Sequence, residues 1–131
     1  MHAPAVSVLD LPPRLDDAVR RTLAEADRVL VPVDAGPRAR RALREVAAAV
    51  AGRPPGTLRE ALAGTLPRDV DRWALLEELE ALAPAALLAT TLPAGRARAL
   101  VPRLYAPGTA GARAYARLAA ELGLVSASTS P

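Results

Sequence analysis

The sequence contains neither cysteine nor lysine. The absence of cysteine excludes disulfides, thiolate zinc sites and cysteine nucleophiles. The absence of lysine excludes Schiff-base catalysis. It also excludes a phosphate-binding P-loop of the form G-x-x-x-x-G-K-[ST], whose lysine reaches the β- and γ-phosphates of a nucleotide. All 17 basic residues are therefore arginine.

Aromatic residues are scarce, with one tryptophan, two tyrosines and no phenylalanine in 131 residues. So few rings argue against a stacking platform for single-stranded bases. Long hydrophobic runs are also missing: no stretch approaches the roughly 18 uncharged apolar residues of a membrane span. Residues 1–9 lack the basic start and long apolar region of a signal peptide. We therefore expect a cytoplasmic protein with no membrane span.

The composition that remains is typical of a globular protein, at 51% hydrophobic and 24% charged residues. We expect one domain over residues 1–125 and a polar, flexible tail over 126–131. The net charge of +3 is small. Because alanine and arginine are both abundant throughout, the number of arginines is a poor functional signal, and basicity indicates nucleic-acid binding only where the arginines cluster.

Apolar runs that end at prolines alternate with segments of helical periodicity. Strands are predicted at residues 5–9, 29–33, 85–92 and 100–104, and helices at 16–26, 37–51, 69–82 and 109–123, with Asp69 and Thr109 as N-caps. The segment from 58 to 66 is ambiguous between a helix opening at 58 and a strand of small residues at 61–66, and we favour the strand. Such alternation predicts an α/β fold with a mainly parallel sheet flanked by helices.

Two segments in the correct order resemble a known family. V-L-D-L-P-P (8–13), followed by A-D-R-V-L-V-P-V (26–33), resembles the central segment of ParA/MinD-type ATPases, which move plasmids, chromosomes or division-site factors. L-Y-A-P-G-T-A-G-A-R-A-Y-A-R-L-A-A-E-L (104–122) is similar to the closing segment of chromosomal ParA proteins. The resemblance covers nearly the whole chain but only the second half of a full-length relative, and it implies a partial P-loop NTPase-like fold.

The resemblance implies vestigial nucleotide-binding positions. Asp10 would help to hold magnesium through water, Pro12 and Pro13 would shape the switch loop, and Pro93 would end the strand beside the nucleotide base. From the residues alone, Asp10 is more simply a strand-end acid or part of a helix-entry turn, and the prolines are strand terminators. Because the P-loop and its lysine are missing, we expect no ATP hydrolysis by this chain and no cofactor, although intact relatives use ATP and magnesium.

Arginines cluster in two places that are candidates for DNA contact. Four lie near the start of one predicted helix, at Arg38, Arg40, Arg41 and Arg44. Their spacing places pairs on adjoining faces, where they would meet phosphates without reading sequence, and the alternative is a solvated helix face. Arg96 and Arg98 lie where relatives carry basic residues used on DNA. We interpret Trp73 as a core residue.

The resemblance leads to a functional hypothesis with two alternatives. The leading one is a non-catalytic module of chromosome or plasmid partition, associated with the nucleoid, that docks a partner or another ParA-type subunit and adds weak, sequence-independent DNA contact. The second is an incomplete reading of a full ParA-type ATPase, and the third is a gene fragment without function. We also expect self-association, because a central strand at 5–9 would have unpaired backbone groups.

Overall fold

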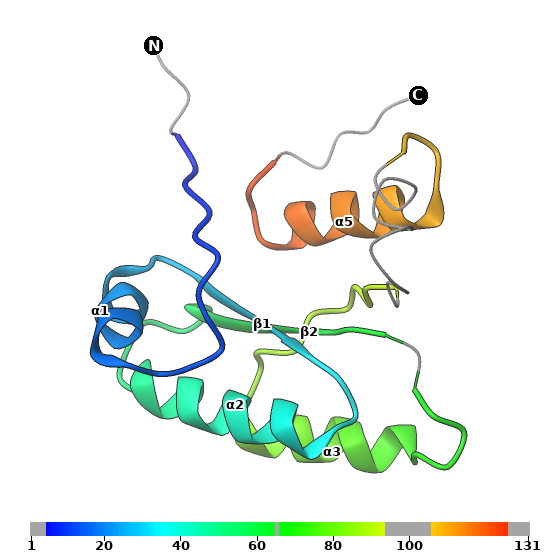
Figure 1. Cartoon of the computed structure of the whole chain (residues 1–131). Helices are drawn as coiled ribbons and strands as arrows, with labels where there is room; N and C mark the ends of the chain where they lie inside the picture. The colour runs from blue at the N-terminus through cyan, green and yellow to red at the C-terminus, as the bar shows by residue number, and fades with distance from the viewer. Residues whose placement is uncertain (1–4, 65, 94–105, 126–131) are drawn as a thin grey trace.

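The computed structural model describes residues 5–64, 66–93 and 106–125. Its elements run in the order α1 (Asp17–Glu25), β1 (Val29–Val33), α2 (Pro37–Ala49), β2 (Leu58–Leu62), α3 (Arg72–Leu82) and α5 (Ala110–Glu121). Strands β1 and β2 are parallel, and α2 connects them (Figure 1). The predicted α/β class is therefore confirmed. The expected short strand at 100–104 and the tail at 126–131 lie outside the described residues.

Strand β2 occupies the centre of the sheet. On one side it pairs with β1, with Val29 opposite Leu58. On the other side the N–H of Glu60 donates to the carbonyl of Ala86 at 2.8 Å, and the N–H of Leu88 donates to the carbonyl of Glu60 at 2.8 Å. The strand predicted at 85–92 thus lies parallel to β2, but it is joined to β2 by two isolated bridges and not by a continuous ladder.

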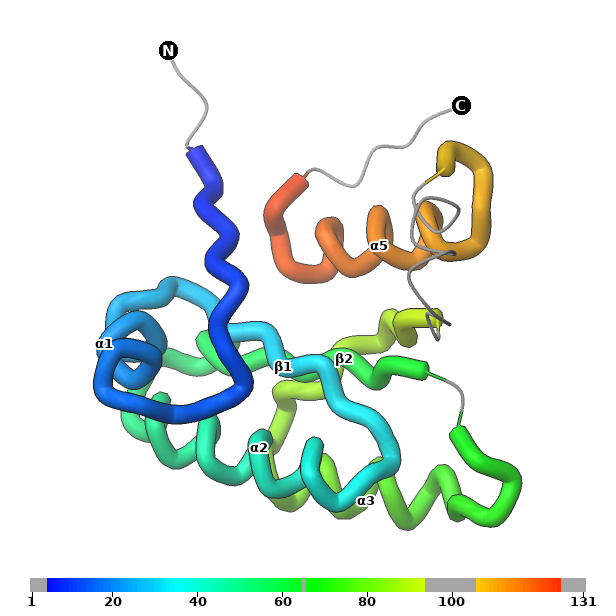
Figure 2. The backbone as a smooth tube through the Cα atoms, viewed as in Figure 1, coloured from blue at the N-terminus to red at the C-terminus, as the bar shows by residue number. Residues whose placement is uncertain are grey.

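Helices cover both faces of this small sheet (Figure 1, Figure 2). Helices α2 and α3 lie side by side on one face, where Val33, Leu43, Leu62, Leu75 and Leu79 form the core. Helix α5 lies on the other face. Its core consists of Ala61, Leu88, Leu92, Leu118 and Leu122. Helix α1 packs at the end of α2 through a third cluster, and the four predicted helices are all present.

Short polar side chains determine where the helices begin. Asp16 accepts a hydrogen bond from the N–H of Val19 at 2.9 Å at the start of α1, and Thr109 caps α5, as predicted. The start predicted for α3 is wrong by two residues. Asp71, not Asp69, accepts from the N–H of Trp73 at 3.0 Å and so forms the N-cap. The ambiguous segment contains a strand, as favoured, but this strand, β2, runs from Leu58 to Leu62, so the range predicted for it, 61–66, began three residues too late.

The strand predicted at residues 5–9 is absent, which is a correction. The segment is extended but unpaired, and Val8 is 82% exposed. The edge of β1 away from β2 gives a physical reason. Val29 and Val33 direct their backbone groups to β2, so the outer edge belongs to Leu30 and Pro32, and Pro32 has no N–H to donate. The expected larger sheet of a P-loop NTPase is not found in the part of the chain that the structure describes.

Candidate functional site

The vestigial nucleotide-binding positions do not converge on one site. Asp10, Pro12 and Pro13 are exposed in the loop that leads into α1, and Asp10 follows no strand because residues 5–9 form none. Pro93 is half-buried after Leu92. No hydrogen bond or packing cluster of the described residues links Pro93 with Asp10.

Magnesium requires several oxygen ligands. Asp10 offers one exposed carboxylate, and residues 5–64, 66–93 and 106–125 contain no group of three or more histidine, aspartate or glutamate side chains suited to a metal ion. This donor set does not fit a magnesium ion. The metal role of Asp10 rests on the resemblance alone and stays a prediction.

Arg38, Arg40, Arg41 and Arg44 all lie on α2, and one of them is used within the fold. The Nε atom of Arg40 lies 3.1 Å from Oε1 of Glu78 on α3, and its Nη1 donates to the carbonyl of Ala35 at 3.0 Å. Arg38, Arg41 and Arg44 are exposed, and no ion pair among the described side chains involves them. These three are therefore the cations of α2 that are available to a partner.

The helical phase separates the charged residues of α2 into two groups. Successive residues turn by about 100° around a helix axis. Arg40 faces α3, so Arg38, two residues earlier, lies on the opposite flank of α2, and Glu45 follows it there two turns later. Arg44, one turn after Arg40, lies on the flank near α3, and Arg41 lies between the flanks on the outer surface. Arg38 and Arg41 can therefore be tested as separate features.

Trp73 is not a core residue, which corrects its interpretation from the sequence. Leu75 and Leu79 turn toward the sheet and are buried. Trp73 is two positions before Leu75, so its side chain points roughly the opposite way, and it is 76% exposed. Glu77, one turn after Trp73, is exposed on the same side of α3. The sequence signal for an exposed Trp73 was the four-residue spacing of Leu75 and Leu79. That spacing predicts a different buried face from the one formed by Trp73, Leu76 and Leu79.

Helices α2 and α3 together present one outer surface, which we call the α2–α3 face. The two helices run side by side in the same direction (Figure 1). The face consists of Pro37, Arg41 and Arg44 on α2 and of Trp73 and Glu77 on α3, all exposed. Its charges are therefore positive on one helix and negative on the neighbouring helix, with the single tryptophan at the start of the acidic helix.

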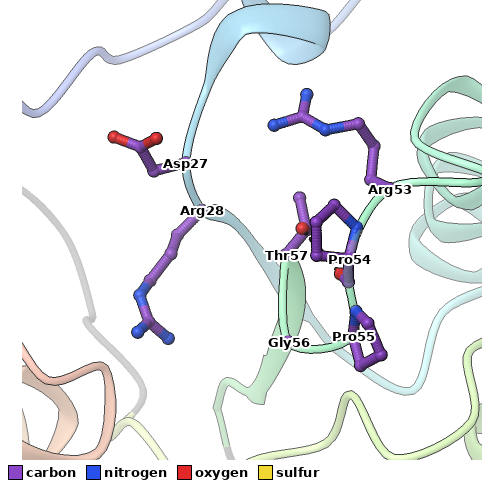
Figure 3. A pocket seen from close by; sticks show the side chains of 7 residues that line it. All are labelled: Asp27, Arg28, Arg53, Pro54, Pro55, Gly56 and Thr57. Carbon is purple, nitrogen blue, oxygen red and sulfur yellow. Dashed lines mark hydrogen bonds between the residues drawn. The ribbon is translucent and has the colours of Figure 1, made fainter.

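Two hollows open at the end of the sheet where strands β1 and β2 begin. The first, of about 270 Å³, is lined by Asp27 and Arg28 before β1 and by residues 53–57 before β2 (Figure 3). A second, mostly apolar hollow of about 340 Å³ lies where α2 and α3 end. Both lie at the amino ends of the parallel strands, whereas ligands in open α/β sheets bind at the carboxyl ends.

Two arginines line the first hollow, Arg28 and Arg53, and Arg53 has a structural role. Arg53 donates from Nη1 to the carbonyl of Leu23 at 3.2 Å and from Nη2 to the carbonyl of Ala26 at 2.6 Å, and it also contacts the carbonyl of Ala24. These carbonyls lie at the end of α1, where a positive charge is stabilising. Arg53 therefore fastens α1 to the loop before β2 and is not available to bind a ligand anion.

Glu60 is the least expected residue of the core. It lies on the central strand with its side chain fully buried, and neither carboxyl oxygen has a hydrogen-bond partner among the residues described. Burial raises the pKa of Glu60 to about 7, and the negative charge of Glu80 adds to the increase. The sequence signal that could have found it is the alternation along the strand, which places Glu60 on the same face as Leu58 and Leu62.

Helix α5 is held to the sheet by Glu121. Its carboxylate accepts hydrogen bonds from the N–H groups of Ala89 at 3.0 Å and Thr90 at 2.6 Å, and from the Thr90 hydroxyl. Burial alone would raise the pKa of Glu121, but these bonds and the charge of Arg59 outweigh it and lower the pKa. The contact explains why the chain between the two bridges to β2 turns away from a regular strand.

The second predicted arginine pair, Arg96 and Arg98, lies outside the described residues. In the portion that is described, no helix has the length and apolar character needed to cross a membrane. No protein-family model matches the sequence, and comparisons with curated proteins and with solved structures likewise found no match.

Proposed function

We propose that this chain is a non-catalytic docking module of a ParA/MinD-like partition system, and that it binds another protein through the α2–α3 face. The observation that carries the proposal is Trp73, which stands 76% exposed beside charged residues. Tryptophan and arginine dominate the binding energy of protein interfaces, so a face that presents both is suited to docking. The relationship to partition proteins, and the partial P-loop NTPase-like fold, rest on the quoted sequence segments.

Docking is favoured over small-molecule chemistry by the state of the charged groups. In the first hollow Arg53 is occupied by carbonyls of α1, and in the core Glu60 is sealed from solvent. Arg41, Arg44 and Glu77, which have no described ion pair, lie together on an outer helix surface, where only a macromolecule meets several of them at once.

The test measures ATP hydrolysis by a purified ParA/MinD-type ATPase from the same organism, with and without this chain. The chain alone is expected to show no magnesium-dependent turnover above a buffer blank. Added to the ATPase, it is expected to change the rate saturably. Trp73→Ala should abolish that change, and Arg117→Ala on α5 should leave it intact. The absence of any change, or a change that survives Trp73→Ala, would overturn the proposal.

DNA contact is the second candidate, and exposed Arg38 and Arg41 favour it. Arginines on one helix bind phosphates without reading sequence. Such contact would associate the protein with the nucleoid. Its test is given below.

A further inference from the structure

We infer that the α2–α3 face binds the same face of a second copy of this chain, forming a two-fold symmetric dimer. The inference rests on the docking role proposed above, because it assigns a second copy of the chain to the same face. In a two-fold interface the same patch is used on both subunits, so the patch must be complementary to itself. Charge and register both give the α2–α3 face this property.

The charge argument follows from the direction of the two helices. Helices α2 and α3 run side by side in the same direction (Figure 1). Consider a two-fold axis that lies between the facing surfaces and is nearly parallel to the helices. It places α2 of each copy on α3 of the other copy. The positive helix then meets the negative helix twice, once on each side of the axis.

The register of this contact comes from an ion pair within one chain. The 3.1 Å contact of Arg40 with Glu78 shows that these two residues lie within side-chain reach of each other along the paired helices. Arg41 and Glu77 are their sequence neighbours on the outer surface, so they lie within about one helical turn of the same level. Rotation about an axis close to the helix direction keeps these levels, so Arg41 of one copy comes within side-chain reach of Glu77 of the other.

Pro37 and Trp73 form a second contact in the same register as Arg41 and Glu77. Pro37 precedes Arg41 by four residues on α2, and Trp73 precedes Glu77 by four residues on α3. When Arg41 meets Glu77, Pro37 therefore approaches Trp73 at the amino ends of the two facing helices. The indole gains an apolar partner there, and one position of the axis serves both contacts.

The chemistry of the charged contact is favourable. Arg41 and Glu77 are each exposed and without a described ion pair, so no existing bond must break when they meet. Their guanidinium and carboxylate groups can form a pair of parallel hydrogen bonds. Arg44, one turn further along α2 on the flank near α3, adds positive charge beside the acidic helix of the second copy.

The size of the face predicts weak association. Helices of 13 and 11 residues are about 20 Å and 16 Å long. Two such helices present less than the roughly 800 Å² per partner of a standard stable interface. We therefore expect a reversible dimer with a Kd in the micromolar range. At high concentration the dimer would cover the docking face.

DNA is the less favoured occupant of this face. Phosphates would attract Arg41 and Arg44 but would be repelled by Glu77 and by Glu78, which lies beside it on α3. A second copy satisfies the charges of both helices, and it also gives Trp73 an apolar partner.

The experiment is sedimentation velocity of the full chain over a concentration series, with the emission of Trp73, the single tryptophan, as a second readout. The wild-type chain is expected to shift from monomer to dimer, and its emission to move to shorter wavelength as the indole becomes partly covered. Arg41→Glu alone and Glu77→Arg alone should each raise the Kd at least tenfold, because each places like charges opposite one another twice. Arg117→Glu on α5 serves as the matched control and should leave the Kd unchanged.

Mixing the two weakened variants isolates the contact between subunits. In a mixed dimer, position 41 of the first variant and position 77 of the second carry opposite charges, and the unchanged Glu77 and Arg41 form the other attractive pair. An equimolar mixture of Arg41→Glu and Glu77→Arg is therefore expected to regain dimerisation that neither variant shows alone. Thermal unfolding of each variant checks that it remains folded.

A chain that stays monomeric at every concentration would overturn the inference, and so would a mixture that fails to associate while wild type does. These results are distinguishable from failure of the docking proposal. The dimer is measured without any ATPase, so loss of the dimer together with a Trp73-dependent effect on the ATPase would leave the docking role standing.

Discussion

Among single residues, Glu60 makes the stability of the fold depend on pH. Its folded pKa of about 7 lies above the ordinary value of 4.5. Between these values the folded chain retains a proton that the unfolded chain releases, so the free energy of unfolding decreases as pH rises from about 4.5 to 7 and then stays low. The shift corresponds to a loss on the order of 3 kcal/mol.

Glu60→Leu is therefore expected to remove this pH dependence and to raise stability at pH 8. Urea unfolding at pH 5 and pH 8 measures both effects. Glu25→Gln, at an exposed position of α1, is the control and should preserve the wild-type slope. If Glu60→Leu retains the full decrease between pH 5 and pH 8, another group is responsible for it.

Among the elements, α5 depends on a side-chain contact with the segment beside β2. Glu121 binds two backbone N–H groups of the segment beside β2 and the hydroxyl of Thr90. Hydrogen bonds to a charged group contribute about 1.5–3 kcal/mol each, less where solvent reaches them. Because the carboxylate has a lowered pKa, its contribution is present above the ordinary pKa of glutamate and is lost as pH falls through the folded value.

Glu121→Ala is expected to loosen α5 before the rest of the molecule. Amide hydrogen exchange should accelerate in α5 and at residues 89–90, while β2 and α2 keep their protection. Glu25→Ala, which lies on α1, is the matched control and should leave α5 protected. Equal acceleration in every element would instead indicate that Glu121 contributes only to global stability.

For the molecule as a whole, the arrangement of charge predicts how it meets DNA. Any binding is expected to be independent of sequence and to weaken as salt increases, because arginines that meet phosphates release counterions. Reversal of charge at Arg96 and Arg98 should weaken binding more than reversal at Arg14 and Arg20. Arg38→Glu should weaken binding without affecting the dimer, since Arg38 lies on the flank of α2 away from α3.

Fluorescence anisotropy with two duplexes of unrelated sequence, at several salt concentrations, measures these effects. Equal losses of affinity at all four positions would indicate that binding depends on the net positive charge and not on particular arginines. Affinity that does not depend on salt would contradict phosphate contact altogether.

Periodicity and capping residues predicted much of this fold. Val19 and Leu23 on α1, the apolar run of β1, and Thr109 before α5 are local signals, since a helix or strand buries one face at a spacing that the sequence itself displays. The same reasoning placed the arginines of α2 on one exposed helix. It predicted the wrong N-cap for α3, Asp69 in place of Asp71, because the sequence pattern does not distinguish two aspartates that are two positions apart.

The sequence by itself determined the α/β class, the order of the elements and the absence of thiol and lysine chemistry, because composition and local spacing do not depend on distant contacts. Only the tertiary structure decided which apolar segments pair and which polar residues are buried. Residues 5–9 have a strand pattern, yet the accessible edge of β1 ends in Pro32 and offers few partners. Trp73 was expected in the core but is exposed, and Glu60 is buried, for the same reason: burial depends on what packs against a residue. Here α2, α3 and the sheet meet over Glu60 and leave Trp73 facing outward.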